Sequence, residues 1–153
     1  MKVVVQRVRD ASVRVDGTVS GAIQSGLLVY LGVAKGDSEQ DAAWLAEKIM
    51  GLRIFEDENG KMNLSVQDCG GGILVVSQFT LLADARKGRR PSYNDAASPQ
   101  RAENLYEYFM RHMCALGIQV QSGVFGAHMD VAYINDGPVT ILLQSPQEED
   151  TTQ

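Results

Sequence analysis

The sequence contains little cysteine and little histidine. Cys69 and Cys114 are the two cysteines, and His112 and His128 the two histidines, of a chain of 153 residues. No pair of them stands at the spacing of zinc ligands, so no metal is expected. A disulfide is rare in a reduced compartment, and we predict that both thiols are free and buried by packing. Each histidine is predicted to be structural, with a satisfied hydrogen bond.

Long apolar runs, a basic surface and cofactor loops are also missing. No segment approaches the roughly 18 continuous apolar residues of a membrane span. The first valines are interrupted by Gln, Arg and Asp, unlike a signal peptide, and we expect a cytoplasmic protein. A formal net charge of −5 excludes a uniformly basic nucleic-acid-binding surface. Neither a GxGxxG fingerprint nor a Walker loop is present.

The pattern that is present predicts one domain of class α+β. Residues 1–145 carry the apolar periodicity, and 146–153 form an acidic tail that we expect to be frayed. Several links are short hairpins, so much of the sheet is expected to be antiparallel, in a mixed, barrel-like core with two main helices packed on it. The helices are predicted over 39–55 and 100–116, and the strands over 1–8, 12–21, 26–37, 53–65 (a hairpin), 73–82, 118–125, 128–134 and 139–144.

Polar residues interrupt one apolar strand, "ILVVSQFTLL". Ser77, Gln78 and Thr80 occur where a buried strand would be apolar, and a buried polar group without a partner costs about 1–3 kcal/mol. Either the strand ends near Ser77 and the chain turns, or both faces meet polar partners. The side chains then bond nearby backbone, or they point into a pocket at the strand's end. Thr80 is a conceivable nucleophile only with a base beside it.

A cluster of cations follows in "RKGRRPSY". Lys87, Arg89 and Arg90 stand beside Tyr93 on a segment without periodicity, which predicts a surface loop. Cations with an aromatic neighbour suit a phosphate backbone or a single-stranded end. The alternative is an ordinary solvated, charged loop.

A Gly-Pro pair lies between two apolar runs in "NDGPVT", residues 135–140. Asn-Asp-Gly-Pro is good hairpin chemistry, and the direct interpretation is a turn that joins two strands. Pro138 removes a backbone donor and Gly137 keeps the backbone permissive, so two carbonyls can point outward from a rigid segment. Composition alone does not fix a cis Gly-Pro bond.

Together these motifs resemble the D-aminoacyl-tRNA deacylase family. "SQFTL" at 77–81 and "NDGPVT" are similar to its two signatures, and "ADARKGRRPSY" at 83–93 is similar to its intervening loop. "GVFGAHMDV" at 123–131 resembles the approach to the second signature, and "MKVVVQRV" with Arg7 also fits. The likeness extends to about residue 145. Ala85 and Tyr93 depart from it, where a hydroxyl residue and Phe are expected.

The resemblance implies a homodimer that hydrolyses the ester between a D-amino acid and the terminal ribose of tRNA, and also glycyl-tRNA mischarged on tRNA(Ala). In the family the Gly-Pro bond is cis and enters the partner subunit's active site. Carried over, the carbonyls of Gly137 and Pro138 bind the substrate's α-amino group, and an L side chain collides with them. The partners implied are aminoacyl-tRNA and a second copy of the chain, with neither membrane nor DNA.

The resemblance also assigns the remaining site residues. The catalytic signature is Ser77, Gln78, Phe79 and Thr80, with the Phe79 N–H as oxyanion donor, Thr80 as support, and the ribose 2′-OH assisting the chemistry. Arg7 is expected to hold the Gly-Pro segment by hydrogen bonds. The positions around the pocket and adenosine are Phe125, Met129, Asn135 and Thr140, and those that contact tRNA phosphates are Lys87, Arg89 and Arg90. No metal or organic cofactor is implied. The alternatives are a non-catalytic RNA-binding module and a generic acyl-ester hydrolase with Thr80 as nucleophile.

Overall fold

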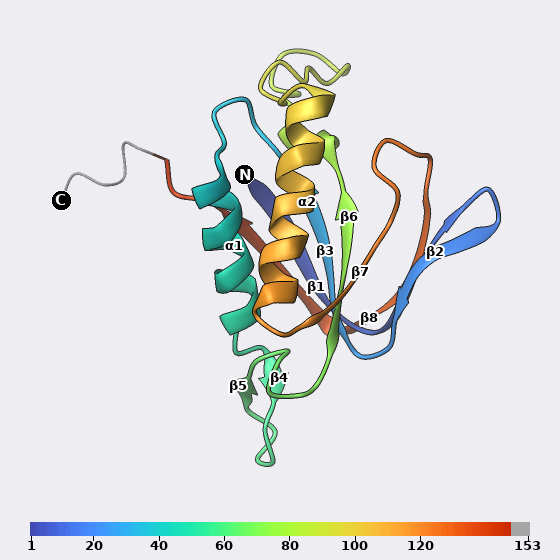
Figure 1. The fold of residues 1–153 in the computed structure, drawn as a ribbon, viewed down its shortest axis with the longest axis vertical. Coiled ribbons are helices and arrows are strands. Elements are labelled where there is room, and N and C mark those ends of the chain that lie inside the picture. The colour runs from blue at the N-terminus through green and yellow to red at the C-terminus, as the bar shows by residue number, and fades with distance from the viewer. Residues whose placement is uncertain (148–153) are drawn as a thin grey trace.

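A computed structural model of the chain describes residues 1–147. Two helices, α1 (Glu39–Gly51) and α2 (Pro99–Ala115), lie side by side across one face of a six-stranded sheet (Figure 1). A 3₁₀ helix, η1 (Phe79–Leu82), follows the fourth strand of that sheet along the chain. The sheet strands are β1 (Lys2–Val15), β2 (Thr18–Ile23), β3 (Gly26–Gly32), β6 (Gly72–Ser77), β7 (Gln119–Ser122) and β8 (Asp130–Gln144), and a separate hairpin joins β4 (Phe55–Glu56) to β5 (Met62–Leu64).

The sheet is mixed and nearly closed. β1 pairs antiparallel with β2, β3 and β8, whereas β3–β6 and β6–β7 are parallel. The two end strands, β2 and β7, approach each other: the Ser20 hydroxyl of β2 donates to the Ser122 carbonyl of β7 at 3.4 Å. A Cβ on Gly21 would lie 2.5 Å from the same carbonyl oxygen, so only glycine fits at this approach of β2 to β7. The predicted α+β class with a barrel-like sheet and two helices is confirmed.

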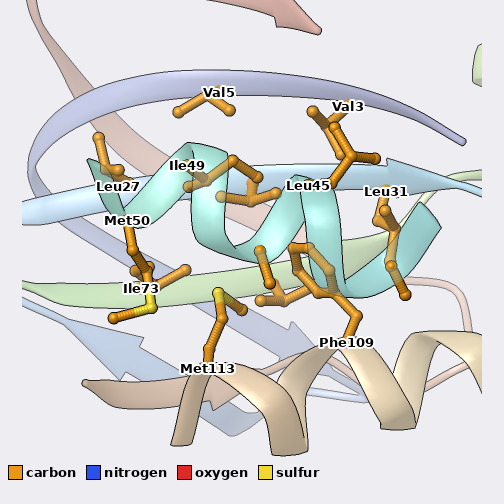
Figure 2. Packing of buried hydrophobic residues seen from close by; sticks show 14 of the residues in the cluster. Val3, Val5, Leu27, Leu31, Leu45, Ile49, Met50, Ile73, Phe109 and Met113 are labelled. Atoms are coloured by element: carbon orange, nitrogen blue, oxygen red, sulfur yellow. The ribbon is translucent and has the colours of Figure 1, made fainter. Parts of the chain in front are cut away.

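The main core lies between the helices and the sheet. Leu45 and Ile49 of α1, and Phe109 and Met113 of α2, are buried against it (Figure 2). The strands supply the sheet side of this core, because every second side chain of a strand faces the same side. Each such aliphatic or aromatic side chain contributes roughly 1.5–3 kcal/mol on burial. The strand residues labelled in Figure 2 are Val3, Val5, Leu27, Leu31 and Ile73.

A second, smaller core fills the other face of the curled sheet. It contains Leu28 of β3 and Leu74 of β6, both fully buried, together with Val8 and Val13 of β1. The strands β3 and β6 are therefore covered on both faces. Such burial accounts for the continuous apolar run of β3, although the strand ends at Gly32 and not at residue 37 as predicted.

Local caps fix where the two helices begin, but α1 ends at Gly51 and not at residue 55 as predicted, because Phe55 and Glu56 pair with β5 as β4. The Ser38 backbone N–H donates to the Asp41 carboxylate at 2.8 Å, which fixes the start of α1. The Ser98 hydroxyl accepts from the Arg101 N–H at 3.4 Å, and Pro99 is the first residue of α2. Gly117 follows α2 with φ of +94° and completes its C-terminus.

The two longest strands, β1 and β8, each span two segments that were predicted as separate strands. The segments predicted as separate strands at 1–8 and 12–21 share one strand, β1, up to Val15. The segments predicted at 128–134 and 139–144 also form one strand, β8, which runs through "DGPVT". That segment is therefore no turn between two strands. Long pairing with β1 on both sides keeps β8 on course, a tertiary constraint that local turn chemistry does not contain.

Three side chains are also less buried than predicted. Cys69 and Cys114 are free, as expected, but both are exposed. His128 has a side chain that is 96 % exposed, so it is not a satisfied structural histidine. His112 does match the prediction, with its Nε2 3.0 Å from the Glu47 carboxylate.

The end of the chain lies partly outside the structure. Residues 148–153, most of the predicted acidic tail, fall outside the described residues. The division into a domain over 1–145 and a tail over 146–153 stays a prediction. Within residues 1–147, no helix has the length and apolar character needed to cross a membrane.

Candidate functional site

A pocket opens where β6 ends. It has a volume of about 520 Å³ and is walled by the end of β6, the start of α2 and the segment 125–131. The carboxyl ends of parallel strands are a common place for sites, because the chain turns away there and leaves a hollow. Ser77 and Gln78 of the "SQFTL" signature contribute polar groups, and most of the apolar wall comes from other segments. The lining includes Ser77, Gln78, Phe79, Tyr106, Phe125, His128 and Met129. We call it the β6 pocket.

The signature residues turn the chain at the pocket's floor. β6 ends at Ser77 and η1 begins at Phe79, so the first of the two interpretations of this segment is correct. The Gln78 N–H donates to the Leu31 carbonyl at 2.8 Å and fixes the turn to β3. The Phe79 N–H is in the first turn of η1, where no intrahelical acceptor exists, and no hydrogen bond from it is found within residues 1–147.

Thr80 has no base hydrogen-bonded to it within residues 1–147. Its hydroxyl accepts a hydrogen bond from the Gln78 side-chain amide. Across the described part of the chain, no carboxylate or imidazole is hydrogen-bonded to it, and Thr80 does not line the β6 pocket. A threonine without a base is poorly activated as a nucleophile.

Tyr106, which sequence reasoning missed, forms the buried wall of the pocket. Its ring lies 5.8 Å from that of Phe125, and its hydroxyl donates to the Val75 carbonyl at 3.4 Å. Burial raises the pKa of Tyr106, so the phenol stays protonated and acts as a donor rather than a base. The only signal in the sequence was its position within the helical stripe of α2. His128, also missed, stands exposed at the rim, 3.9 Å from Asp130.

The second signature forms a bulge in β8. Gln6 of β1 pairs with Thr140 and Val8 pairs with Asn135, so residues 136–139 lie opposite Arg7 alone. We call residues 135–140 the Gly-Pro bulge. The Gly137–Pro138 peptide bond is cis, and both residues are exposed.

Asn135 and Arg7 hold this bulge from the inner side. The Asn135 amide donates at 3.0 Å to the carbonyls of Arg7 and Val139, which bridges the two strands. The buried guanidinium of Arg7 donates to the Ile54 carbonyl at 2.6 Å. Its Nε approaches the Asp136 carboxylate at 3.3 Å as an ion pair, without the alignment of a hydrogen bond.

Arg7 contacts the Gly-Pro bulge in two ways. Its carbonyl accepts a hydrogen bond from the Asn135 amide and its guanidinium pairs with Asp136, whereas within residues 1–147 no hydrogen bond joins it to Gly137 or Pro138 themselves. Its role in holding the segment stays a prediction. Gly137 adopts φ of +119°, and a Cβ there would lie 2.9 Å from Val139 Cγ2 and 3.0 Å from Arg7 Nη2. Position 137 of the bulge thus has room for glycine only.

A loop of cations projects at the same end of the molecule as the start of α2 (Figure 1). Asp84 and Ser92 close it by two backbone hydrogen bonds of 2.8 Å. Hydrogen bonds from Arg86 lower the pKa of Asp84 to about 2, so this carboxylate stays ionised and pairs with Arg86. We call residues 84–92 the cationic loop. Its remaining cations, Lys87, Arg89 and Arg90, are exposed and have no ion-pair partner within residues 1–147.

The predicted site residues, apart from Thr80 in η1, which does not line the pocket, fall into three places. Ser77, Gln78, Phe79, Phe125 and Met129 line the β6 pocket. Arg7, Asn135, Gly137, Pro138 and Thr140 belong to the Gly-Pro bulge and its support. Lys87, Arg89 and Arg90 lie on the cationic loop. None of residues 135–140 lines the β6 pocket of the same chain.

Metal ligands do not gather in the described part of the chain. Residues 1–147 contain no group of three or more His, Cys, Asp or Glu side chains that could hold a metal ion. The chemistry available at the β6 pocket is that of amide and hydroxyl donors beside an apolar wall.

Comparison with known proteins shows which family the chain belongs to. The fold and site define a class: a two-helix α+β protein whose curled, mixed sheet carries a pocket at the end of a parallel strand. The model of the family described as D-Tyr-tRNA(Tyr) deacylase matches residues 4–144. A D-aminoacyl-tRNA deacylase of Koribacter versatilis (strain Ellin345) is 62 % identical over 148 residues, which cover 97 % of this chain and 99 % of that protein. The chain belongs to the D-Tyr-tRNA(Tyr) deacylase family of enzymes, which confirms the resemblance.

Solved structures agree on the fold. The structure titled c-Myc DNA Unwinding Element Binding Protein is 43 % identical with a TM-score of 0.91, and the match covers 96 % of this chain and 100 % of that chain. A probable eukaryotic D-amino acid tRNA deacylase is similar at 17 % identity with a TM-score of 0.80, over 93 % of this chain and 97 % of that one. At that identity the second likeness supports the fold alone.

Proposed function

We propose that this protein hydrolyses the ester bond of D-aminoacyl-tRNA and releases the free D-amino acid and tRNA. The observation that carries the proposal is the family match over residues 4–144, combined with a β6 pocket built from the family's first signature. The D-aminoacyl-tRNA deacylase activity named for the relatives fits an apolar hollow lined by hydrogen-bond donors. The place of action that we propose is the cytoplasm, where aminoacyl-tRNA is made and used.

The reaction needs a water molecule and a donor for developing charge. Water adds to the ester carbonyl carbon, the bond from that carbon to the ribose oxygen breaks, and the ribose oxygen takes up a proton. The Phe79 N–H, free of any protein acceptor among the described residues, is the group that we assign to the carbonyl oxygen as it becomes negative. The neighbouring ribose 2′-OH of the substrate positions or activates the water. Thr80 supports Gln78 by accepting its hydrogen bond.

We assign the rejection of L-aminoacyl-tRNA to the Gly-Pro bulge of a second copy of the chain. The bulge is exposed, held from behind by Arg7 and Asn135, and absent from the lining of its own chain's pocket. The carbonyls of Gly137 and Pro138 would receive the substrate's α-ammonium group, and an L side chain would collide with the backbone there. Glycine has no side chain to collide. The same site would therefore accept glycyl-tRNA mischarged on tRNA(Ala).

A homodimer would bring the two parts together. In the single chain β8 exposes Leu142 (75 %) and Tyr133 (37 %) on one face, whereas Ile134 (51 %), the next residue after Tyr133, faces the other side of the strand. Clustered apolar exposure of this kind is typical of a protein–protein interface. We propose that this face of β8, continuous with the Gly-Pro bulge, lies between the two subunits.

The test compares three substrates: D-tyrosyl-tRNA, L-tyrosyl-tRNA and free D-tyrosine methyl ester. We expect hydrolysis of the first and neither of the others. Binding of D-tyrosyl-tRNA without turnover would leave an RNA-binding module, and equal turnover of the methyl ester would favour the generic hydrolase with Thr80 as nucleophile.

Nucleic-acid binding without chemistry is a separate outcome. The name of one solved relative refers to a DNA element, and an exposed loop of cations binds phosphates of either nucleic acid. A single-stranded DNA competitor is the control. We expect it to inhibit hydrolysis of D-tyrosyl-tRNA far less than uncharged tRNA does.

A further inference from the structure

Two aromatic rings stand exposed at the mouth of the β6 pocket. The rings of Phe79 and Tyr93 meet edge to face, with centroids 5.0 Å apart and planes inclined by 67°. Phe79 is 59 % exposed and Tyr93 36 % exposed. An aromatic pair of the core would be buried, so this one forms part of the surface.

The Phe79–Tyr93 pair connects the β6 pocket with the cationic loop. Phe79 lines the β6 pocket. Tyr93 directly follows Ser92, which closes the cationic loop by its two hydrogen bonds to Asp84. The rings therefore lie between the pocket and a loop that carries three cations without an ion-pair partner in the described residues.

We propose that the Phe79–Tyr93 pair is a stacking platform for the unpaired nucleotide that precedes the terminal adenosine of tRNA. The inference rests on the proposed function, because it is the ester in the β6 pocket that fixes which nucleotide reaches the rings. Any base has a flat face that stacks on an aromatic ring, and such stacking is worth about 1–3 kcal/mol per base. Lys87, Arg89 and Arg90 are placed to bind the phosphates on either side.

The charge balance of the loop supports this assignment. Asp84 neutralises Arg86 by an ion pair of 2.7 Å and leaves the other cations to a ligand. Cations next to exposed aromatic rings are the combination that single-stranded nucleic acid requires. An aromatic pair that merely covered the pocket would need neither the exposure nor the cations.

The first experiment compares D-tyrosyl-tRNA with D-tyrosyl-adenosine, which lacks the preceding nucleotide. For Tyr93→Ala we expect KM for D-tyrosyl-tRNA to rise about 5- to 100-fold, with little change in kcat. The KM for D-tyrosyl-adenosine should stay within about twofold. Tyr93→Phe should restore the wild-type KM, and Tyr93→Leu, which keeps apolar bulk without a ring, should not.

Two results would overturn the platform. An equal rise in KM for both substrates would assign Tyr93 to the adenosine or to the pocket itself. A wild-type KM for Tyr93→Leu would show that apolar cover suffices. If the wild-type protein hydrolysed neither substrate, the proposed function would fail instead.

A second measurement tests the platform without catalysis. An RNA hairpin with an unpaired CCA 3′ end is compared with the same hairpin ending in a single unpaired A, by fluorescence anisotropy. The wild-type protein should bind the CCA hairpin more tightly, and Tyr93→Ala and Tyr93→Leu should remove that difference. No difference between the two hairpins on the wild-type protein would contradict the platform, whatever the activity.

Discussion

The β6 pocket and the Gly-Pro bulge are built in opposite ways. The pocket is a hollow of about 520 Å³, formed where a strand stops and the backbone turns away. The bulge is an exposed stretch of backbone inside a strand that continues, supported by Arg7 and Asn135. In the proposed function, the hollow accepts the substrate and the supported backbone of a second copy excludes the L enantiomer.

The largest effect should come from adding a side chain at Gly137, where the bulge has no room for a Cβ. In Gly137→Ala the new Cβ meets Arg7 Nη2 at 3.0 Å and Val139 Cγ2 at 2.9 Å, at a φ that L side chains rarely adopt. The bulge must shift, and a shift of about 1 Å in a positioning element costs about 100-fold in rate. We expect kcat/KM for D-tyrosyl-tRNA to fall at least about 100-fold.

The matched control for that substitution is Gly51→Ala. Its Cβ would meet nothing within 4 Å, and its φ is not in the left-handed region. Its activity should remain within about twofold of wild type. Wild-type kcat/KM for Gly137→Ala, with the fold verified by circular dichroism, would remove the bulge from the site.

The next effect should come from separating the two regions by breaking the proposed dimer. Leu142 is 75 % exposed on β8, and an aspartate there would place a charge in an apolar interface. Leu142→Asp should sediment as a monomer and lose about 10- to 100-fold in kcat/KM for D-tyrosyl-tRNA at the same dilution. A monomeric variant with full activity would show that one chain holds the whole site.

A smaller effect is expected from weakening the support of the bulge. Arg7 and Arg9 both pair with Asp136, at 3.3 Å and 3.6 Å, but the Arg7 side chain is 7 % exposed and that of Arg9 71 %. Arg7→Met leaves the Ile54 carbonyl without its donor and leaves the Asp136 carboxylate with the exposed Arg9 alone. We expect the free energy of unfolding to fall by about 2–4 kcal/mol and activity to fall with it.

Arg9→Met tests whether the loss of stability in Arg7→Met comes from the burial of Arg7 and not from the loss of a charge beside Asp136. An exposed ion pair contributes little, and this variant should unfold within about 0.5 kcal/mol of wild type. Urea unfolding of both variants measures the difference. Equal losses would mean that the Asp136 charge, and not the buried guanidinium, stabilises the bulge.

The two regions also differ in how far the sequence could predict them. The pocket was predictable because its signal is local: polar residues at the end of an apolar strand require partners or a turn, and β6 does end at Ser77. The caps at Ser38 and Ser98 were predictable for the same reason. Each depends on residues within one helical turn.

The bulge was not predictable as a structure. Its turn chemistry is the same whether β8 reverses or continues, and the choice is made by β1, more than a hundred residues away in the sequence. The role of Arg7 shows the same limit, because its acceptor is the Ile54 carbonyl. The family resemblance supplied a hypothesis that local patterns do not contain, namely that residues 135–140 and the "SQFTL" segment belong to one site.

The smallest effect should come from Thr80, the residue that the alternative hydrolase would use as its nucleophile. Thr80→Ala removes a hydroxyl that accepts a hydrogen bond from Gln78 and touches no base among the described residues. Losing one such bond is worth about 1 kcal/mol, so kcat/KM for D-tyrosyl-tRNA should stay within about tenfold of wild type. Thr80→Ser, which keeps the hydroxyl, should stay closer still. A loss of about 10⁴-fold with the fold intact would make Thr80 the nucleophile, and the pocket would then be a covalent site, complete in chemistry and dependent on the bulge for chirality alone.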